Sequence, residues 1–445
     1  FDNFASNYIA IMNKLLLSAT LLTVMSTTAL AQSGTNSPYS QYGLGLLSDY
    51  GTGFNRGMNG LGLGFHEHGQ INYMNPASYS SLDSLSFIFD AGFSGQLTNF
   101  KENGVKKNAK NGVFDYVVAG FRAAKHVGVS FGVIPYSNIG YKYATTGDLN
   151  NKQSPSYQTY TNTFEGNGGL HQVYLGVGWQ PFTGLSIGAN IAYLWGNYTR
   201  SVVNSYSDVY VNTISKYYTA TVNNYKLDFG VQYTARLSKK DELTIGATYG
   251  LGHKLDVDPE CRIISNNSQT NVSDTTSLKI KNGLELPTTF GGGLMFNHNN
   301  KLKVGVDYSL MQFSKVGYPE YTLENGVPKY VLSNNIYKDR HKLTLGAEFC
   351  PNEKGRKFSN RLHYRLGASY ATPYYKVNGV EGPKEYGVSV GLGIPVINEW
   401  NNRSILNISG SWVRQEALGL IKENTFRINI GFTFNERWFA KWKVE

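Results

Sequence analysis

Few residues in this chain have the types and spacing that could support metal binding. His66-Glu67-His68 places two imidazoles on the same side of an extended segment. A metal site needs further ligands that converge on the ion, and no nearby motif offers them. We therefore interpret this stretch as a polar turn and predict no metal.

Motifs for phosphate binding and hydrolysis are also missing from the sequence. The glycines at positions 57, 60, 62 and 64 precede no Gly-Lys-Ser/Thr and lie in no βαβ unit, so they do not form a phosphate loop. There is no Gly-x-Ser-x-Gly elbow and no zincin helix. A surface enzyme whose triad assembles from distant residues stays open, but nothing points to one. We predict no catalytic residue, no cofactor and no enzymatic activity.

The composition favours a large β-protein. The 445 residues include 32 Tyr, 23 Phe and 49 Gly, and only 16% are charged. Such a chain is too aromatic and too weakly charged to stay disordered, and no run approaches the roughly 20 apolar residues of a spanning helix. The net charge of +10 comes from scattered Lys and Arg, which predicts no nucleic-acid partner. We place the small cluster of Lys106, Lys107 and Lys110 on a solvated loop.

The amino end has the pattern of an export signal. Lys14 supplies the positive region, Leu15 to Met25 the short apolar core, and Ala29-Leu30-Ala31 the cleavage pattern. We expect residues 1–31 to comprise upstream residues and a cleaved signal peptide, with the mature protein starting at Gln32. The protein is then expected outside the cytoplasm.

From Leu85 onward, apolar and polar residues alternate with period two, which is typical of strands with two different faces. Near the end, Phe426, Ile428, Ile430, Phe432 and Phe434 share one face. The apolar faces run about 9–11 residues, the length that a tilted strand needs to cross a bilayer, and aromatic residues recur near their ends. A soluble sandwich is the alternative. Because hydrocarbon leaves no partner for a free backbone amide, such strands cross only as a closed barrel.

The alternation predicts a fourteen-stranded antiparallel transmembrane β-barrel over residues 85–434. Its strands are expected at 85–95, 113–122, 126–135, 170–180, 184–197, 222–237, 242–253, 287–297, 301–312, 338–350, 361–371, 384–396, 403–413 and 424–434. Connections after even-numbered strands are short, and those after odd-numbered strands are long, as at Tyr136–Gly169, Tyr198–Thr221, Lys254–Leu286 and Phe313–Tyr337. Short inner turns and long outer loops are typical of bacterial outer-membrane barrels. Cys261 and Cys350 then fall at opposite ends, so no disulfide is expected.

Two segments lie outside the predicted strands. Residues 32–84 are Gly-rich, do not alternate, and fit best as a hatch inside the lumen, which fourteen strands leave too wide for wall side chains to fill. Residues 435–445 are expected to form a C-terminal periplasmic tail. Several charged residues are expected to face the lumen: Lys226, Asp228, Arg236, Lys303, Asp307, Lys342, Glu348, Arg365 and Arg427.

A Gly-rich segment, then Asn75-Pro76-Ala77, then the first strand resembles the FadL family of outer-membrane transport proteins for hydrophobic compounds. The resemblance covers the mature chain in architecture and about 40 residues in motif. It implies a fourteen-stranded barrel with an N-terminal hatch, through which an apolar ligand enters from outside and leaves sideways through the wall. Asn75, Pro76 and Ala77 are then either a structural turn between hatch and wall or part of a gate. The Tyr-rich, tailed style is similar to that of Bacteroidota members.

In the FadL family, the sideways exit depends on a kink in the third strand. Pro135 and Gly140 interrupt that strand here, and proline removes a donor from the ladder. They mark either a wall opening or merely the start of the outer loop. In the tail, Trp438, Phe439 and Trp442 stand beside basic residues and either anchor the chain in the headgroup region or dock a partner.

Two functions follow from these patterns. The first is passive uptake of a small hydrophobic or amphipathic compound across the outer membrane of a Gram-negative bacterium, in contact with outer-membrane lipid and lipopolysaccharide. The second is a structural or adaptor subunit of an outer-membrane complex for protein secretion or barrel assembly, which would hold outer-membrane or periplasmic proteins through the tail.

Overall fold

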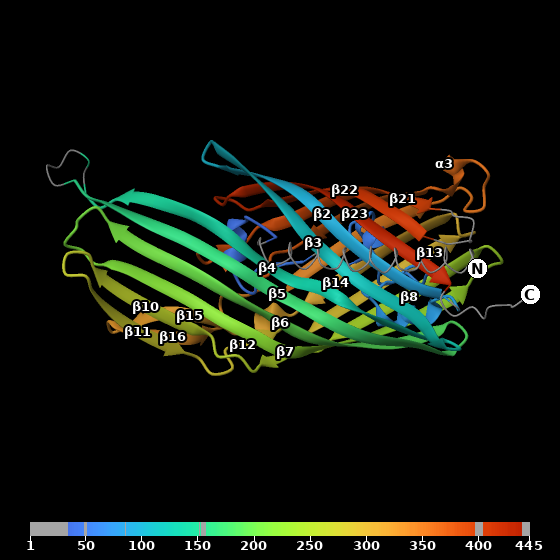
Figure 1. The fold of residues 1–445 in the computed structure, drawn as a ribbon, viewed down its shortest axis with the longest axis horizontal. Coiled ribbons are helices and arrows are strands. Elements are labelled where there is room, and N and C mark those ends of the chain that lie inside the picture. The colour runs from blue at the N-terminus through green and yellow to red at the C-terminus, as the bar shows by residue number, and fades with distance from the viewer. Residues whose placement is uncertain are drawn as a thin grey trace, which may run out of the picture.

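The computed structural model describes residues 34–48, 51–84, 86–150, 152, 157–396 and 404–437. Within them, fourteen antiparallel strands form one closed wall, in which each strand pairs with the next and β23 pairs with β2 (Figure 1). The wall strands are β2 (Ser86–Glu102), β3 (Val105–Ala124), β4 (Val127–Asp148), β5 (Thr159–Phe182), β6 (Leu185–Tyr206), β7 (Thr213–Arg236), β8 (Asp241–Gly250), β13 (Thr289–His298), β14 (Leu302–Met311), β17 (Arg340–Phe349), β18 (His363–Ala371), β21 (Lys384–Val396), β22 (Ser404–Glu416) and β23 (Lys422–Arg437). The predicted fourteen-stranded antiparallel barrel is confirmed.

The alternation along each strand separates an apolar outer face from a polar inner one. On β21, Val388 and Val390 are 46% and 59% exposed, whereas Ser389 between them is 2% exposed. A water-soluble sheet would bury those valines against a core. The apolar side chains instead cover the outside of the wall.

Strands β2 to β7 extend further than the alternation indicated, all toward the same end of the barrel (Figure 1). The predicted outer loops Tyr136–Gly169 and Tyr198–Thr221 are largely strand, because β4 pairs with β5, and β6 with β7, far beyond the apolar band. In the outermost parts of these extensions (144–148, 159–165, 201–206 and 213–219), both faces are half-buried or exposed, so hydrophobic alternation does not mark them.

The remaining predicted loops also contain pairing strands. Between β8 and β13 lie β9 (His253–Leu255), β10 (Glu260–Asn267), β11 (Val272–Lys279) and β12 (Leu284–Leu286). Here β10 pairs with the outer part of β7. Elsewhere the structure has η3 (Phe313–Lys315), β15 (Tyr318–Glu324), β16 (Val327–Ser333), α3 (Phe358–Arg361), β19 (Lys376–Val377) and β20 (Val380–Glu381).

Residues 34–48 and 51–84, here called the N-terminal segment, pack against the inner face of the wall. They contain η1 (Pro38–Gln41), β1 (Leu46–Leu47), α2 (Gly53–Arg56) and η2 (Pro76–Ser81). Ile71, Tyr79 and Leu82 form one buried cluster with wall residues that include Tyr116 and Tyr174. Phe54, Met58, Leu61 and Phe65 form another with Met295.

No helix among the described residues is long and apolar enough to cross a membrane. The expected export signal, residues 1–31, lies outside the described residues. So do Trp438, Phe439 and Trp442 of the expected tail. β23 runs to Arg437, three residues beyond the predicted end at Phe434, because Asn435 to Arg437 pair with β2.

Candidate functional site

Asn75-Pro76-Ala77 begins η2 and connects the N-terminal segment to the wall. The Asn75 side-chain oxygen accepts a hydrogen bond from the Ala77 amide at 3.2 Å, which caps the helix. Its side-chain amide donates to the carbonyls of Leu63 and of Val231 in β7, at 3.0 and 3.3 Å. Pro76 stands at the first helical position, where its missing N–H costs nothing.

Three glycines, here called the glycine row, let this turn lie directly on the wall backbone. Gly178, Gly188 and Gly230 stand opposite one another on β5, β6 and β7. A Cβ added at Gly178 would lie 2.6 Å from the Pro76 carbonyl oxygen, and one at Gly188 would lie 2.4 Å from the Pro76 carbonyl carbon. A Cβ added at Gly230 would lie 2.1 Å from the Asn75 side-chain oxygen. No real side chain fits in such gaps, so the close approach requires glycine.

We expect Asn75→Ala to lower the free energy of unfolding by about 2 kcal/mol, because it removes a helix cap and two hydrogen bonds to carbonyls. Urea unfolding of the purified barrel in detergent micelles, followed by Trp fluorescence, measures this change. Asn334→Ala in an exposed loop is the matched control and should stay within about 0.5 kcal/mol. Equal effects of the two variants would show that Asn75 is no anchor.

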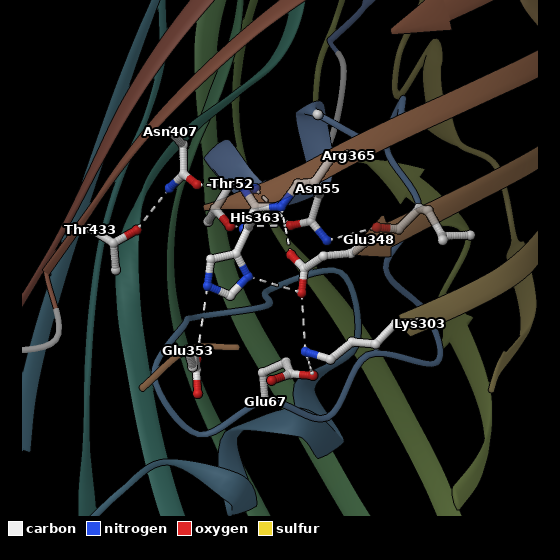
Figure 2. A network of polar contacts seen from close by, with 12 residues as sticks. Thr52, Asn55, Glu67, Lys303, Glu348, Glu353, His363, Arg365, Asn407 and Thr433 are labelled. Carbon is white, nitrogen blue, oxygen red and sulfur yellow. Dashed lines mark hydrogen bonds and ion pairs between the residues drawn. The ribbon is translucent and has the colours of Figure 1, made fainter. Parts of the chain in front are cut away.

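A buried ionic network joins the N-terminal segment to β14, β17 and β18 (Figure 2). Glu348 lies at its centre: its carboxylate oxygens lie 3.1 Å from Lys303 Nζ and 2.6 Å from Arg365 Nε. Lys303 Nζ also lies 2.6 Å from a carboxylate oxygen of Glu67 in the N-terminal segment. Lys303, Glu348 and Arg365 are each at most 8% exposed. Buried charges of this kind are tolerated only when they are paired.

The network continues around the wall through side-chain hydrogen bonds and returns to the N-terminal segment. Arg365 donates to Asn407 at 2.5 Å, and Asn407 donates to Thr433 at 3.2 Å. Asp90 accepts from Thr433 and from Tyr116, both at 2.8 Å. The Tyr116 hydroxyl in turn accepts from the Gly53 amide at 2.7 Å. These groups lie on β18, β22, β23, β2, β3 and α2 in turn. The N-terminal segment is therefore fixed to both sides of the barrel.

Two cavities lie between the N-terminal segment and the wall. One measures about 180 Å³ and reaches Gln172, Asp228 and Asp307; the other measures about 130 Å³ and reaches Pro135 and Asn138. Leu47 and Ser48 line both cavities, so β1 and the residue after it separate them.

The larger cavity holds two hydrogen-bond acceptors without partners. Asp307 accepts from the amides of Gly62 and Leu63 at 2.7 and 2.8 Å through one oxygen, while its Oδ1 has no partner in the described part of the chain. Gln172 Oε1 is unpaired in the same way. Both residues are at most 5% exposed. Buried groups of this kind are normally satisfied, so the cavity suits a molecule that carries a donor.

The pairing between β3 and β4 stops part of the way along the wall. It ends at Val117↔Val133, although both strands continue outward from there, and β3 stays paired with β2 as far as Val105. β1 pairs with the edge of β4 that β3 leaves free, through Leu46↔Asn138 and Leu47↔Ser137. The register of β4 with β5 shifts between Pro135 and Ser137. We call this interrupted pairing the β3–β4 seam.

The predicted kink residues lie at this seam, inside a continuous strand. Pro135 lies within β4 rather than at its end, so the interpretation that it starts the outer loop is wrong. Gly140 exchanges hydrogen bonds with Ser40 of η1, whose hydroxyl accepts from the Gly140 amide at 3.1 Å. Both residues therefore border the N-terminal segment, whereas Asn75-Pro76-Ala77 lies against β5 to β7.

The histidines near Glu67 contribute to the local structure of the N-terminal segment. His66 Nδ1 lies 2.8 Å from the Gln232 side-chain oxygen, and His68 Nδ1 lies 3.0 Å from the Ser81 carbonyl. Burial lowers the pKa of His66, which favours its neutral form. No group of three His, Cys, Asp or Glu in the described part of the chain is placed to hold a metal ion.

An aromatic cluster lies where η1 meets the outer parts of the wall strands and the loops beyond them. Its buried aromatic members include Tyr39, Tyr136, Tyr198, Phe313, Tyr337, Tyr374 and Tyr375. Arg200 of β6 bonds the Gly43 carbonyl and, at 3.1 Å, the Tyr318 hydroxyl, and its guanidinium lies over the Tyr198 ring at 4.6 Å. Burial raises the pKa of Tyr337 and Tyr375 well above the usual value, so these hydroxyls stay neutral.

The sequence pattern predicts that the charged wall residues of the network, Lys303, Glu348 and Arg365, face inward. It does not predict the glycine row, β1 or the aromatic cluster. The glycines lie on the three consecutive strands β5, β6 and β7 and carry no motif of their own. The three glycines line up only when the register of these strands is known, and the register is fixed only when neighbouring strands pair.

Solved structures share this architecture at low sequence identity. The Ralstonia pickettii toluene transporter TbuX matches with a TM-score of 0.59 and 14% identity over 87% of this chain and 98% of that chain. The P. putida toluene transporter TodX matches with 0.58 and 12% over 89% and 100%. A Pseudomonas aeruginosa FadL homologue gives 0.57 and 11% over 88% and 99%. These likenesses show a FadL-type fold.

None of the curated proteins matches this chain. One family model does, under the description BamG, and it matches residues 12–445. Since that match spans nearly the whole sequence, the chain belongs to the BamG family.

Proposed function

We propose that this protein is an outer-membrane barrel for the passive uptake of a small hydrophobic or amphipathic compound. The N-terminal segment serves as its hatch, and the β3–β4 seam serves as a lateral exit. The observation that carries this proposal is the interrupted pairing of β3 with β4. The two-residue strand β1 covers the free edge of β4 there, beside both cavities, and Ser40 of η1 bonds Gly140 further along the same strand.

The size and lining of the cavities support a small ligand. The larger cavity measures about 180 Å³, and an engineered apolar cavity of about 150 Å³ is known to hold benzene. A single aromatic ring fits such a space, whereas a long acyl chain does not. The unpaired oxygens of Asp307 and Gln172 favour a ligand with a hydroxyl or amine. TbuX and TodX are described as toluene transporters, which supports the same size class.

The lateral route is tested by fixing β1 to β4. Leu47 and Ser137 stand directly opposite each other, so the double variant Leu47→Cys/Ser137→Cys can form a disulfide across the pair. We expect oxidation to lower the entry of labelled toluene or benzyl alcohol into proteoliposomes at least tenfold, because β1 can no longer leave the seam. Reduction should restore entry.

The matched control is the double variant Thr322→Cys/Lys329→Cys, whose positions pair in the exposed hairpin of β15 and β16. It should pass both probes equally well before and after oxidation. Unchanged entry through the oxidised Leu47–Ser137 variant would exclude movement of β1 as the exit step. No entry in the unmodified protein, at any ligand size tested, would exclude uptake.

A second function is favoured by how firmly the N-terminal segment is held. It is held by the Glu348 network, the glycine row and the aromatic cluster. A barrel whose N-terminal segment is fixed in this way suits a structural or adaptor subunit of an outer-membrane complex for protein secretion or barrel assembly, including a Bacteroidota-type one. Residues 438–445, with Trp438, Phe439 and Trp442, are the candidate docking tail.

Gentle detergent extraction followed by mass spectrometry separates the two functions, since an adaptor leaves the membrane with partners in fixed ratio. Deleting residues 438–445 keeps β23 whole, because the strand ends at Arg437. We expect this deletion to release an adaptor's partners and to leave the uptake of a transporter unchanged. Recovery of a lone barrel from both proteins would exclude the adaptor function.

A further inference from the structure

An apolar groove of about 1020 Å³ lies on the outer face of the wall, away from the lumen. It crosses β2, β3, β18, β21, β22 and β23, and its walls include Leu366, Val390 and Ile428, which are 59–62% exposed. Three glycines deepen it: Gly95, Gly112 and Gly410. No atom lies within 4 Å of a Cβ built at any of them, so nothing in the described protein occupies this space.

The groove sits at one edge of the apolar band. On β2, outward-facing positions are apolar from Phe87 to Leu97 and polar at Asn99 and Lys101. Eleven strand residues at about 3.3 Å each, tilted by about 40°, span roughly 25 Å, the height of the apolar band of such barrels. Leu97 therefore marks the hydrocarbon boundary, and the groove lies just inside it.

A cluster of lysines stands directly beyond that boundary. Lys110 pairs across from Leu97, and Lys101 pairs across from Lys106 on the same outward face. The structure gives no ion pair to these three lysines within the described residues. The expectation that Lys106, Lys107 and Lys110 lie on a solvated loop is wrong, because all three belong to β3.

The neighbouring strands add two more cations and one carboxylate. Arg414 and Lys422 lie 2.6 and 3.6 Å from Glu416, which both of them share. Glu102 alternates to the opposite face from Lys101 and so does not neutralise it. The rim is strongly basic, and it directly borders an apolar groove that opens toward lipid.

We propose that this surface binds a phosphorylated, multiply acylated lipid of the outer leaflet, namely the lipid A part of lipopolysaccharide. Its phosphates contact Lys101, Lys106 and Lys110, and its acyl chains fill the groove over Gly95 and Gly410. Lysine binds phosphate as a mobile point charge, and the groove offers acyl chains an apolar bed. A zwitterionic phospholipid lacks the clustered phosphates, so charge complementarity selects lipid A.

The proposal rests on the outer-membrane location but not on transport. Its test uses the purified, folded full chain in detergent micelles, with lipid A or phosphatidylethanolamine added, and native mass spectrometry to count bound lipid. We expect Lys101→Ser/Lys106→Ser/Lys110→Ser to lower lipid A binding at least tenfold and to leave phosphatidylethanolamine binding unchanged. Gly95→Leu/Gly410→Leu should weaken lipid A binding with the charges intact, since it fills the groove.

The matched control is Lys239→Ser/Lys240→Ser, two exposed lysines in the turn between β7 and β8 at the opposite end of the barrel. It should bind lipid A like the unmodified protein. Equal affinity for both lipids, or equal loss in the control, would overturn the proposal, as would a co-purifying protein that occupies the groove. The triple lysine variant should still pass toluene, so a failure of transport and a failure of lipid binding are told apart.

Discussion

Replacing Glu348 with alanine should lower the free energy of unfolding by about 3–5 kcal/mol. The carboxylate holds Lys303 and Arg365 on the strands either side of its own, and all three side chains are buried. Its removal leaves Lys303 with Glu67 alone and leaves Arg365 with the neutral Asn407. Removing one partner of a buried ion pair costs more free energy of unfolding than the intact pair contributes, because the other charge is left uncompensated in a low-dielectric site. Urea unfolding in micelles measures the loss.

Two controls separate lost charge pairing from general damage. Glu324→Ala removes an exposed partner of Lys329 and should change the free energy of unfolding by no more than about 1 kcal/mol. The triple variant Lys303→Met/Glu348→Leu/Arg365→Met removes the three buried charges together, leaves the partly exposed Glu67, and should recover part of the stability that Glu348→Ala loses. A triple variant less stable than the single one would contradict the charge-based explanation.

Replacing Gly188 with valine should displace the N-terminal segment while the wall stays folded. A Cβ at this position would lie 2.4 Å from the Pro76 carbonyl carbon, so the backbone of η2 must move. Valine itself suits a strand, so the cost falls on the seating of the N-terminal segment. Overpacking costs about 1–3 kcal/mol, which corresponds to roughly a 5- to 150-fold rise in the population of the displaced state.

Limited proteolysis of the purified barrel measures that population, since a displaced N-terminal segment is cut while the wall resists. Planar-bilayer conductance supplies a second readout, because a displaced hatch opens the lumen. Gly292→Val is the matched control: no atom lies within 4 Å of its added Cβ, and it should leave both readouts unchanged. Equal cleavage of the two variants would mean that the glycine row does not seat η2.

The alternation of side chains was sufficient to predict fourteen strands in the right places. Phe426 to Phe434 could be assigned to an outer face, and Asn429 and Thr433 to the inner one, because a wall between lipid and lumen imposes period two on each strand. The outer ends of β4 to β7 could not be predicted in this way. Beyond the apolar band, neither face requires apolar residues, so strand and loop have similar hydrophobic patterns.

The same alternation predicted that the side chains of Lys303, Glu348 and Arg365 point inward. It did not predict that these side chains contact one another. They come together only because β14, β17 and β18 pair in one register, and Glu67 reaches them from more than 230 residues away. The glycine row likewise has meaning only once three strands align and Pro76 lies across them. The face of a side chain is a local property set by the strand period. Its partners are set by register and closure, which depend on contacts far apart in the chain.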